Sequence, residues 1–371
     1  MKILIDVPKI PHTVVKELVD YPPANYVYES SFTNFLFPTS IPGFLKKRYE
    51  LFRRKMNVDY KQENKSYDLI HANSKLLLNK KPWVVWTEHP ISFFEWRNYS
   101  NLKSTIHKQI AKKYLASRFC KKVITHNTAA KNSLIKYLGD SDLIKKTEVV
   151  YPAYHLVNEC TKKDTEKVTL LFIGRHFYGK GGREMLLAME VLNRKYDVEL
   201  TMVSPLSDSL SQKYCSIKNL TLHSNGLPYG SLMSLYSQAD IYVDPLFTDG
   251  CATYLEAMSH GLPIVTTDEF ANSEYVIDNK NGLLVKPPIS LYGEGFLTKW
   301  NNWNEFVSVL RSTDTGKMVS ELVDKLSYLI ENRSVRAKLG QEGRREIRDG
   351  KFSIQKRNFA FRRIYEESLD R

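Results

Sequence analysis

Two cations stand in a glycine-rich stretch whose composition suits phosphate binding. The stretch reads LLFIGRHFYGKGGREMLLAMEVL from Leu170. Gly174 ends an apolar run, Arg175 and Lys180 follow it, and two more glycines precede a helical pattern. A guanidinium binds phosphate oxygens bidentately, an ammonium adds a point charge, and the free N–H groups of a helix N-terminus attract anions. The pattern predicts a diphosphate site; the alternative is that the glycines fit a turn and the cations are solvated.

A second stretch combines small residues with a carboxylate. It reads DPLFTDGCATYLEAMSHGLPIVTTDEFANSEYVIDNKNGLLV over residues 244–285, and its first helix bears Glu256. Small side chains before a helix let a phosphate or a sugar approach the backbone N–H groups, and a carboxylate in that helix accepts hydrogen bonds from ribose hydroxyls. The alternative for Glu256 is an acid that stabilises the helix dipole. The small residues are Gly250, Cys251, Ala252 and Thr253.

Short apolar runs between helical patterns must position these residues. Most of the runs are apolar throughout, which is typical of strands in a parallel sheet that is covered on both faces. A polar run, TKKDTEK from Thr161, is interpreted as a linker, and the alternation of strand and helix starts again after it. We therefore expect two doubly wound α/β domains in tandem.

The expected elements follow from these patterns. Strands are expected at 2–7, 67–71, 83–87, 122–125 and 147–151 in the first half, and at 168–173, 199–203, 220–223, 241–243, 263–266 and 282–285 in the second. In the second half, helices are expected at 183–194, 231–238 and 254–259, within 319–348, and at 352–369.

Together the two stretches resemble the retaining GT-B glycosyltransferases of glycosyl transferases group 1, the family that includes sucrose synthase and bacterial mannosyl- and glucosyltransferases. The resemblance runs from about Val168 to Leu369. It implies a GT-B fold of two Rossmann-like domains facing across a cleft, with an acceptor-side domain at 1–160 and a nucleotide-sugar-binding domain at 161–350. It also implies a helix at 351–371 that crosses back onto the first domain, retention of anomeric configuration, and neither a metal nor a cofactor.

The resemblance also assigns roles to single residues. It implies that Arg175 and Lys180 hold the donor pyrophosphate and stabilise the leaving diphosphate, and that Glu256 is the second acid of the family's E-x7-E motif and contacts the ribose. It places Gly174 and the small residues at 250–253 against the donor. The first acid of the motif is missing, because Thr248 stands eight residues before Glu256 and the nearest acid is Asp249. Either Asp249 acts from an altered register, or the sugar is held differently.

In the first half the resemblance is carried by fewer residues. The glycine pair that commonly follows the first strand is absent, and the strand runs into Asp6-Val7-Pro8-Lys9. His89, in WVVWTEHP, stands where the family often keeps a histidine near the donor sugar, and a neutral imidazole there would bind a sugar hydroxyl. A loop residue without a catalytic role is the alternative for His89. His126, at the end of VITH, is a second candidate to face the cleft.

The charge is unevenly distributed along the chain. The 371 residues carry a net charge of +13, and residues 1–163 hold 28 Lys and Arg against 14 Asp and Glu, whereas the remainder holds 26 against 27. A basic first half favours an anionic partner such as a phospholipid surface, a lipid-phosphate acceptor or nucleic acid. Gly43–Met56 mixes six cations with aromatic and aliphatic residues and is a candidate for membrane contact or for the wall of an acceptor cleft. Lys103–Lys122 is a second basic cluster, for which a solvated face is the simplest interpretation.

Several classes of protein are not indicated. The four cysteines form no CxxC pair and have no histidine at ligand spacing, which argues against zinc and disulfides and favours a reducing compartment. The N-terminus is typical of a first strand and not of a signal peptide, and no apolar run has the about 20 residues that a membrane-spanning helix needs. A cytoplasmic protein is expected, with a peripheral position on the inner membrane face as an option.

The expected function is transfer of a hexose from a nucleotide-diphospho-sugar to a hydroxyl of a saccharide or lipid-linked acceptor. Two alternatives remain open at this point. One is a non-catalytic protein that binds an anionic membrane or nucleic acid, although no recognisable DNA- or RNA-binding motif is present and no nucleic-acid partner is expected. The other is a GT-B nucleotide-sugar epimerase, which would form product without an acceptor.

Overall fold

The computed structural model describes residues 2–7, 13–32, 58–59, 67–95, 97–158, 167–224 and 226–369. The chain divides into two compact units. Unit 1 comprises Met1–Ala153, Gly293–Trp303 and Ile354–Arg371, and unit 2 comprises Tyr154–Tyr292 and Asn304–Ser353. The candidate membrane segment Gly43–Met56 and residues 161–166 of the expected linker lie outside the described residues.

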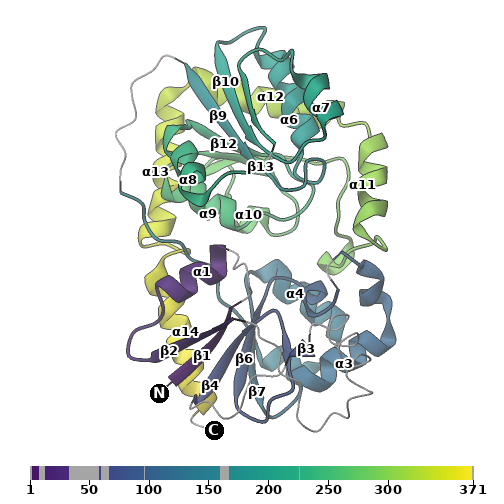
Figure 1. Cartoon of the computed structure of the whole chain (residues 1–371), viewed down its shortest axis with the longest axis vertical. Helices are drawn as coiled ribbons and strands as arrows, with labels where there is room; N and C mark the ends of the chain where they lie inside the picture. Colours follow the sequence, from purple (N-terminus) through teal and green to yellow (C-terminus); the bar gives the residue numbers. More distant parts are fainter. Residues whose placement is uncertain are drawn as a thin grey trace. The chain divides into compact units, whose positions relative to one another are not determined.

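Unit 2 is built on six parallel strands in the order β11-β10-β9-β12-β13-β14 (Figure 1). Most residues of the two central strands, β9 and β12, are aliphatic or aromatic and buried, as is typical of a sheet covered on both faces. The strand order reverses between β9 and β12, so the carboxyl ends of these two neighbours flank a topological switch point. The strands are β9 (Val168–Ile173), β10 (Val198–Val203), β11 (Leu220–His223), β12 (Ile241–Asp244), β13 (Ile264–Thr267) and β14 (Gly282–Val285).

The helices of unit 2 cover both faces of this sheet. The connections from β9 to β10 and from β12 to β13 run in opposite directions, so right-handed crossovers place α6 and α9 on opposite faces. Helix α12 packs on α6, and α13 packs on α9 (Figure 1). The contact with α13 is close, because a Cβ on Gly340 would come within 2.0 Å of the Gly261 carbonyl oxygen. The helices are α6 (Gly182–Leu192), α7 (Asp208–Tyr214), α8 (Tyr229–Gln238), α9 (Ala252–Ser259), α10 (Asn272–Tyr275), α12 (Gly316–Glu331) and α13 (Arg333–Arg348). Helix α11 (Trp303–Ser312) belongs to unit 2 from Asn304 onward.

Unit 1 has its own parallel sheet, in the order β2-β1-β4-β6-β7-β8, and a two-stranded pair β3-β5. Its strands are β1 (Lys2–Val7), β2 (Val27–Phe32), β3 (Val58–Asp59), β4 (Leu69–Asn73), β5 (Leu76–Leu77), β6 (Trp83–Thr87), β7 (Cys120–Thr125) and β8 (Thr147–Val149). Its helices are α1 (Thr13–Asp20), α3 (Thr105–Leu115), α4 (Thr128–Leu138) and α5 (Ser141–Lys145), with short 3-10 turns η2 (Pro90–Phe93), η3 (Tyr99–Lys103) and η4 (Glu294–Phe296).

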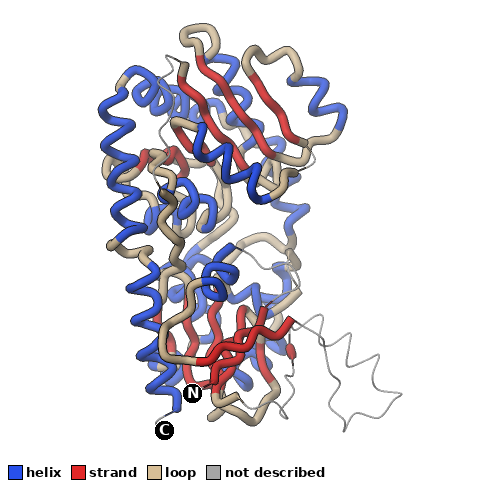
Figure 2. The backbone as a smooth tube through the Cα atoms, turned by 60° about the vertical axis from the view of Figure 1, so that its left-hand side comes forward, coloured by secondary structure: helices blue, strands red, loops and turns tan. Residues whose placement is uncertain are grey.

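The final helix α14 (Ile354–Leu369) belongs to unit 1 and lies beside its strands (Figure 2). An aromatic cluster fixes it there. The Phe361 ring lies 5.0 Å from His71 and 5.1 Å from Trp86, measured between ring centroids. The Tyr365 hydroxyl lies 2.6 Å from Nδ1 of His71. Burial lowers the pKa of His71 to about 3, so this imidazole is neutral and packs as part of the core.

The predicted α/β architecture is confirmed: two parallel six-stranded sheets are present. Strands β2, β3 and β5 were not predicted from the sequence. β2 reads VYESSF at a sheet edge, and β3 and β5 are two residues long, so none presents the continuous apolar run on which the prediction relied. Among the described helices, none combines the length and the apolar character that crossing a bilayer requires.

Candidate functional site

The loop after β9 folds back on itself at the switch point of unit 2, and its glycines make this possible. A Cβ on Gly174 would lie 2.8 Å from the Lys180 Cβ, so only glycine lets the lysine stem cross the turn. Gly181 has a φ of +72°, and a Cβ there would come within 2.0 Å of the Pro245 carbonyl oxygen. The Phe247 N–H donates to the Gly179 carbonyl at 2.9 Å. The loops that follow β9 and β12 are therefore joined, as adjacent parallel strands predict.

Arg175 lies in this loop with its side chain exposed. Among the described residues, none forms a hydrogen bond or an ion pair with its guanidinium. An exposed guanidinium without an internal partner keeps all five of its N–H donors for a ligand. The geometry is that of a cation available to bind an anion from solution.

Lys180 is held differently. Its Nζ lies 3.4 Å from Oδ2 of Asp244 and donates to the Asp249 carbonyl oxygen at 3.3 Å. Asp244 is the last residue of β12 and is fully buried. Burial raises the pKa of Asp244 to about 6, and the Lys180 ammonium opposes this rise. The ammonium is thus fixed at the switch point by a buried carboxylate.

Sequence reasoning did not assign a role to Asp244. The signal was present, because an acid that ends a buried strand at the carboxyl edge of a parallel sheet lies at the usual position of a binding crevice. The pairing of Asp244 with a residue 64 positions away depends on the adjacency of β9 and β12, which the sequence alone does not give.

Glu256 lies within α9 and is 3% exposed. The Tyr236 hydroxyl of α8 donates to its Oε2 at 2.9 Å. Burial, together with the nearby Glu256 charge, raises the pKa of Tyr236, so the phenol stays protonated and remains a donor. The carboxylate is consequently held in one orientation before any ligand binds.

Two helix N-termini in this region lack side-chain caps. α6 begins after Gly181 and α9 after Cys251, and neither N-cap side chain accepts a bond from the first turn. Before α9, Gly250 packs so tightly against the Tyr254 ring that a Cβ would lie 2.2 Å from it, and its N–H donates to Oδ1 of Asn272 at 2.9 Å. Uncapped first-turn N–H groups favour an anion at each helix N-terminus.

Asp249 follows Thr248, the position at which the family's motif has its first acid. Asp249 is half-buried, and the Tyr292 hydroxyl donates to its Oδ1 at 3.1 Å. Thr248 is buried, and its carbonyl oxygen accepts a bond from Nδ2 of Asn272 at 3.3 Å. The structure therefore places Thr248 as a buried link to Asn272 and Asp249 as the acid beside Lys180.

The two candidate histidines lie in unit 1. His89 caps η2: its Nδ1 accepts from the Ile91 N–H at 3.2 Å, so Nε2 carries the proton and donates to the Phe296 carbonyl at 2.9 Å. His126 packs against Trp86, with ring centroids 4.5 Å apart. Both ring nitrogens of His89 are thus engaged within unit 1. These two bonds give His89 a structural role in unit 1. The catalytic role expected for His89 stays a prediction.

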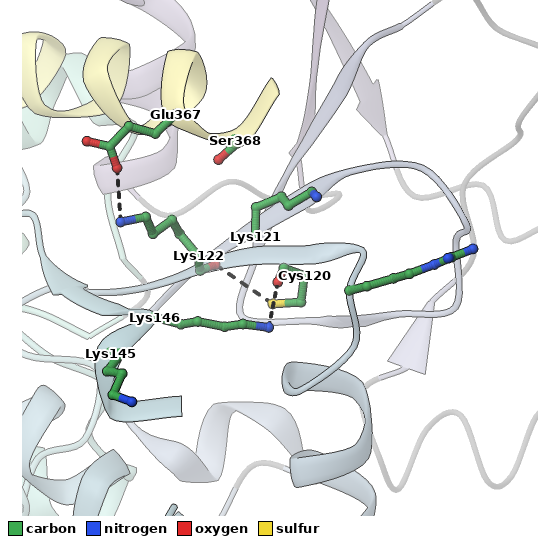
Figure 3. Close-up of a pocket in the computed structure, with 8 residues that line it drawn as sticks. Cys120, Lys121, Lys122, Lys145, Lys146, Glu367 and Ser368 are labelled. Carbon is green, nitrogen blue, oxygen red and sulfur yellow. Dashed lines mark hydrogen bonds and ion pairs between the residues drawn. The ribbon is translucent and has the colours of Figure 1, made fainter. Parts of the chain in front are cut away.

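Unit 1 contains a cavity of about 420 Å³ that includes none of the predicted site residues (Figure 3). Figure 3 shows Lys122 directed toward Glu367 and Lys146 directed toward Cys120. Nζ of Lys122 lies 3.0 Å from Oε2 of Glu367, and Nζ of Lys146 donates to the Cys120 carbonyl oxygen at 3.1 Å. Two of the lysine side chains that line the cavity are therefore bound to groups within unit 1. The cavity is lined by Arg118, Cys120, Lys121, Lys122, Lys145, Lys146, Glu367 and Ser368.

Comparisons with known proteins bear on the fold and on the part of the chain that holds these residues. The family model described as Glycosyl transferases group 1 matches residues 158–306, which include all the unit 2 site residues. A search of curated proteins found no match. Sucrose-phosphate synthase from Thermosynechococcus elongatus is similar in structure, with a TM-score of 0.67 and 12% identity over 100% of this chain and 99% of that chain.

Two further structures are similar over nearly the full length. A glycosyltransferase from Rickettsia africae ESF-5 has a TM-score of 0.64 and 13% identity, covering 99% of this chain and 98% of that chain. Anabaena Alr3699/HepE in complex with UDP-glucose has a TM-score of 0.61 and 16% identity, covering 99% of this chain and 98% of that chain. The protein thus has the GT-B fold, and its residues 158–306 match the model of the glycosyl transferases group 1 family.

Proposed function

We propose that this protein is a retaining glycosyltransferase that moves a hexose from a nucleotide-diphospho-sugar to a hydroxyl of a saccharide or lipid-linked acceptor. The observation that carries the proposal is the pair of cations at the switch point of unit 2. Arg175 is exposed there and has no partner among the residues that the structure describes, and Lys180 is fixed by Asp244. The match to glycosyl transferases group 1 over the same residues supports the reaction class.

The proposed mechanism is electrostatic. When the bond between the sugar and the diphosphate breaks, negative charge develops on the leaving phosphate oxygens. Arg175 binds these oxygens bidentately, Lys180 adds a positioned charge, and the uncapped N-termini of α6 and α9 contribute partial positive charge. Because Lys180 and the two helix N-termini are fixed before the reaction, they stabilise the developing charge with little reorganisation, and no divalent metal is needed for that task.

The remaining donor contacts follow from the same arrangement. We propose that Glu256, oriented by Tyr236, accepts hydrogen bonds from the ribose hydroxyls, and that the small residues before α9 let the donor approach the backbone. The unit 2 segments within 161–350 would bind the nucleotide sugar, and residues 1–160 with the helix in 351–371 would bind the acceptor. A place for His89 beside the donor sugar remains part of the proposal.

The first experiment is a screen for the donor. Purified protein is melted alone and with UDP-, GDP- and ADP-glucose, and stabilisation by one of them is expected. UDP-glucose is the first choice, since Anabaena Alr3699/HepE was solved in complex with it. Arg175→Ala should abolish the shift in melting temperature, whereas Lys317→Ala, which removes an exposed cation on α12, should preserve it. Equal stabilisation of wild type and Arg175→Ala would contradict the proposal.

A second candidate activity is contact with an anionic surface through the basic first half. The excess of Lys and Arg in residues 1–163 and the basic cavity of unit 1 support it. A lipid-phosphate acceptor on the inner membrane face would give this charge a purpose within the same reaction. Cosedimentation with phosphatidylglycerol vesicles at low salt, lost at high salt and absent with phosphatidylcholine, is the expected result. Binding that ignores both salt and lipid charge would exclude it.

A further inference from the structure

Asp249 is connected to a chain of hydrogen bonds that runs through Tyr292 and Ser290 to Glu269. Its carboxylate has two different oxygens in this environment. Oδ1 accepts from the Tyr292 hydroxyl at 3.1 Å, whereas Oδ2 has no hydrogen-bond partner among the described residues. The carbonyl oxygen of the same residue accepts from Lys180 at 3.3 Å. Asp249 is therefore held at one carboxylate oxygen and at its backbone, next to a cation assigned to the donor.

Tyr292 is itself fixed on two sides. Its ring stacks on Phe270, with centroids 4.2 Å apart and planes inclined by 23°. Phe270 has a φ of +47°, a conformation that bulky side chains rarely adopt and that surrounding contacts must maintain. At its backbone, the Tyr292 N–H donates to Oγ of Ser290 at 2.9 Å. These contacts keep the phenol hydroxyl directed at Asp249.

The anchor of this segment is Glu269, which is 6% exposed and follows β13. Its Oε1 lies 2.5 Å from Oγ of Ser290, and the same hydroxyl lies 2.6 Å from the Tyr292 carbonyl oxygen. A serine hydroxyl has one proton, so it cannot donate to both acceptors. All these contacts are satisfied if Glu269 is protonated and donates to Ser290, which then donates to Tyr292.

The electrostatic surroundings favour that protonation state. Burial raises the pKa of Glu269 to about 7, and the negative charges of Asp268 and Asp249 raise it too, while the bonds from Ser290 and from the Tyr292 backbone lower it. The group is thus predominantly protonated in mildly acidic solution and loses its proton as the pH passes about 7.

We propose that Tyr292 is a positioning residue that orients Asp249, so that Oδ2 of Asp249 accepts a hydrogen bond from a hydroxyl of the donor sugar, and that Ser290 and Glu269 fix Tyr292 for this task. The inference rests on the proposed function and deepens it. It also accounts for the missing acid at position 248, where the chain has threonine. Asp249 supplies the carboxylate one residue later, and Tyr292, which lies 43 residues away in the sequence, orients that carboxylate.

The test compares a nucleotide sugar with the nucleotide alone. UDP-glucose and UDP are titrated calorimetrically into wild type, Tyr292→Phe and Asp249→Asn, or the matching GDP or ADP pair if the wild type prefers it. Tyr292→Phe keeps the ring on Phe270 and removes only the hydroxyl. Both variants should bind UDP-glucose roughly tenfold more weakly, the loss expected for one hydrogen bond to a charged group, and should bind UDP as the wild type does. Tyr328→Phe, an exposed tyrosine on α12, is the matched control.

The double variant separates positioning from a general structural effect. If Tyr292 acts through Asp249, Tyr292→Phe should cause no further loss in the Asp249→Asn background. Unchanged UDP-glucose binding by both single variants, or additive losses in the double variant, would overturn the inference. Failure of the proposed function is recognised separately, because the wild type would then bind neither UDP-glucose nor any other nucleotide sugar. Unchanged UDP affinity shows in the same experiment that the variants are folded.

Discussion

The Lys180 ammonium lies 3.4 Å from the fully buried carboxylate of Asp244. A cation that is assigned to the leaving diphosphate is therefore already paired inside unit 2, whereas Arg175 in the same loop has no partner among the described residues. This difference separates the two cations functionally. Arg175 is free to follow the ligand, and Lys180 is a fixed charge whose position depends on Asp244.

For Arg175→Ala we expect activity without stability to change. The side chain is exposed and makes no internal bond in the described structure, so the free energy of unfolding should stay within about 0.5 kcal/mol of the wild type. The turnover number should fall by a factor of about 100 or more, as when one charge-stabilising donor is removed. Urea unfolding and steady-state transfer rates measure the two effects. A large loss of stability would show that the guanidinium has a structural role instead.

Lys180→Met should change both quantities. It removes the cation that the proposal places at the leaving diphosphate. It also deprives the buried Asp244 of its counter-charge, so the pKa of Asp244 should rise above about 6. Turnover should again fall by a factor of about 100. The unfolding free energy at pH 8 should fall relative to the wild type, and Asp244→Asn in the same chain should restore it. No recovery in the double variant would mean that the two side chains are not coupled.

Tyr236→Phe tests the orientation of Glu256. Both groups are buried, and the change leaves Oε2 of Glu256 without the donor at 2.9 Å. A loss of about 1 to 3 kcal/mol in unfolding free energy is expected, because a buried carboxylate loses a hydrogen bond. If Glu256 contacts the ribose, the affinity for UDP should fall as well. The companion change Tyr196→Phe, at a half-buried tyrosine whose hydroxyl donates to the exposed Glu331, is expected to cost less than half as much and to leave UDP binding unchanged.

The stability of the protein should decrease as the pH rises from about 4.5 to about 7, in part because of Glu269. Burial raises the folded-state pKa of Glu269 from 4.5 to about 7, so the folded state retains a proton that the unfolded chain has lost. Its contribution is fully present below pH 4.5 and is lost as the pH passes about 7. Glu269→Gln should flatten this part of the stability profile. An unchanged slope in the variant would show that Glu269 is ionised in the folded protein.

His89→Ala distinguishes the two roles of this histidine. Loss of the η2 cap and of the bond to Phe296 should lower the unfolding free energy by about 1 to 2 kcal/mol. His89→Asn keeps a side-chain acceptor for the Ile91 N–H, so it should recover part of that stability. If activity recovers with stability in the asparagine variant, the role is structural; if the asparagine variant is stable but inactive, the imidazole contacts the donor.

Much of the fold could be predicted from the sequence because its strands are buried on both faces. The runs at Lys2–Val7, Trp83–Thr87, Val168–Ile173 and Gly282–Val285 have the same bounds in the structure as in the prediction. Apolar residues throughout a short run mark such strands without any knowledge of their neighbours. Edge strand β2, with polar residues in its sequence, gives no such mark.

The sequence indicated where the candidate site lies, but it did not identify the residues that hold the candidate side chains in place. Spacing identified the loop that carries Arg175 and Lys180 and the helix that carries Glu256 as candidates, because glycines and small residues precede helices there. The partners Asp244, Tyr236 and Tyr292 could not be found, since each reaches the site from a different strand, helix or loop. Which of many buried polar residues meet at one edge of a sheet is decided by strand order, and strand order was not determined by the local patterns.

The central claim is that a guanidinium and an ammonium at the switch point of unit 2 stabilise a departing nucleoside diphosphate. The most direct measurement is the turnover number of the double variant Arg175→Ala/Lys180→Met with the nucleotide sugar that stabilises the wild type, at saturating donor. The account predicts a loss of at least about a thousandfold, with the far-ultraviolet circular dichroism unchanged. A turnover number within about threefold of the wild type would contradict it.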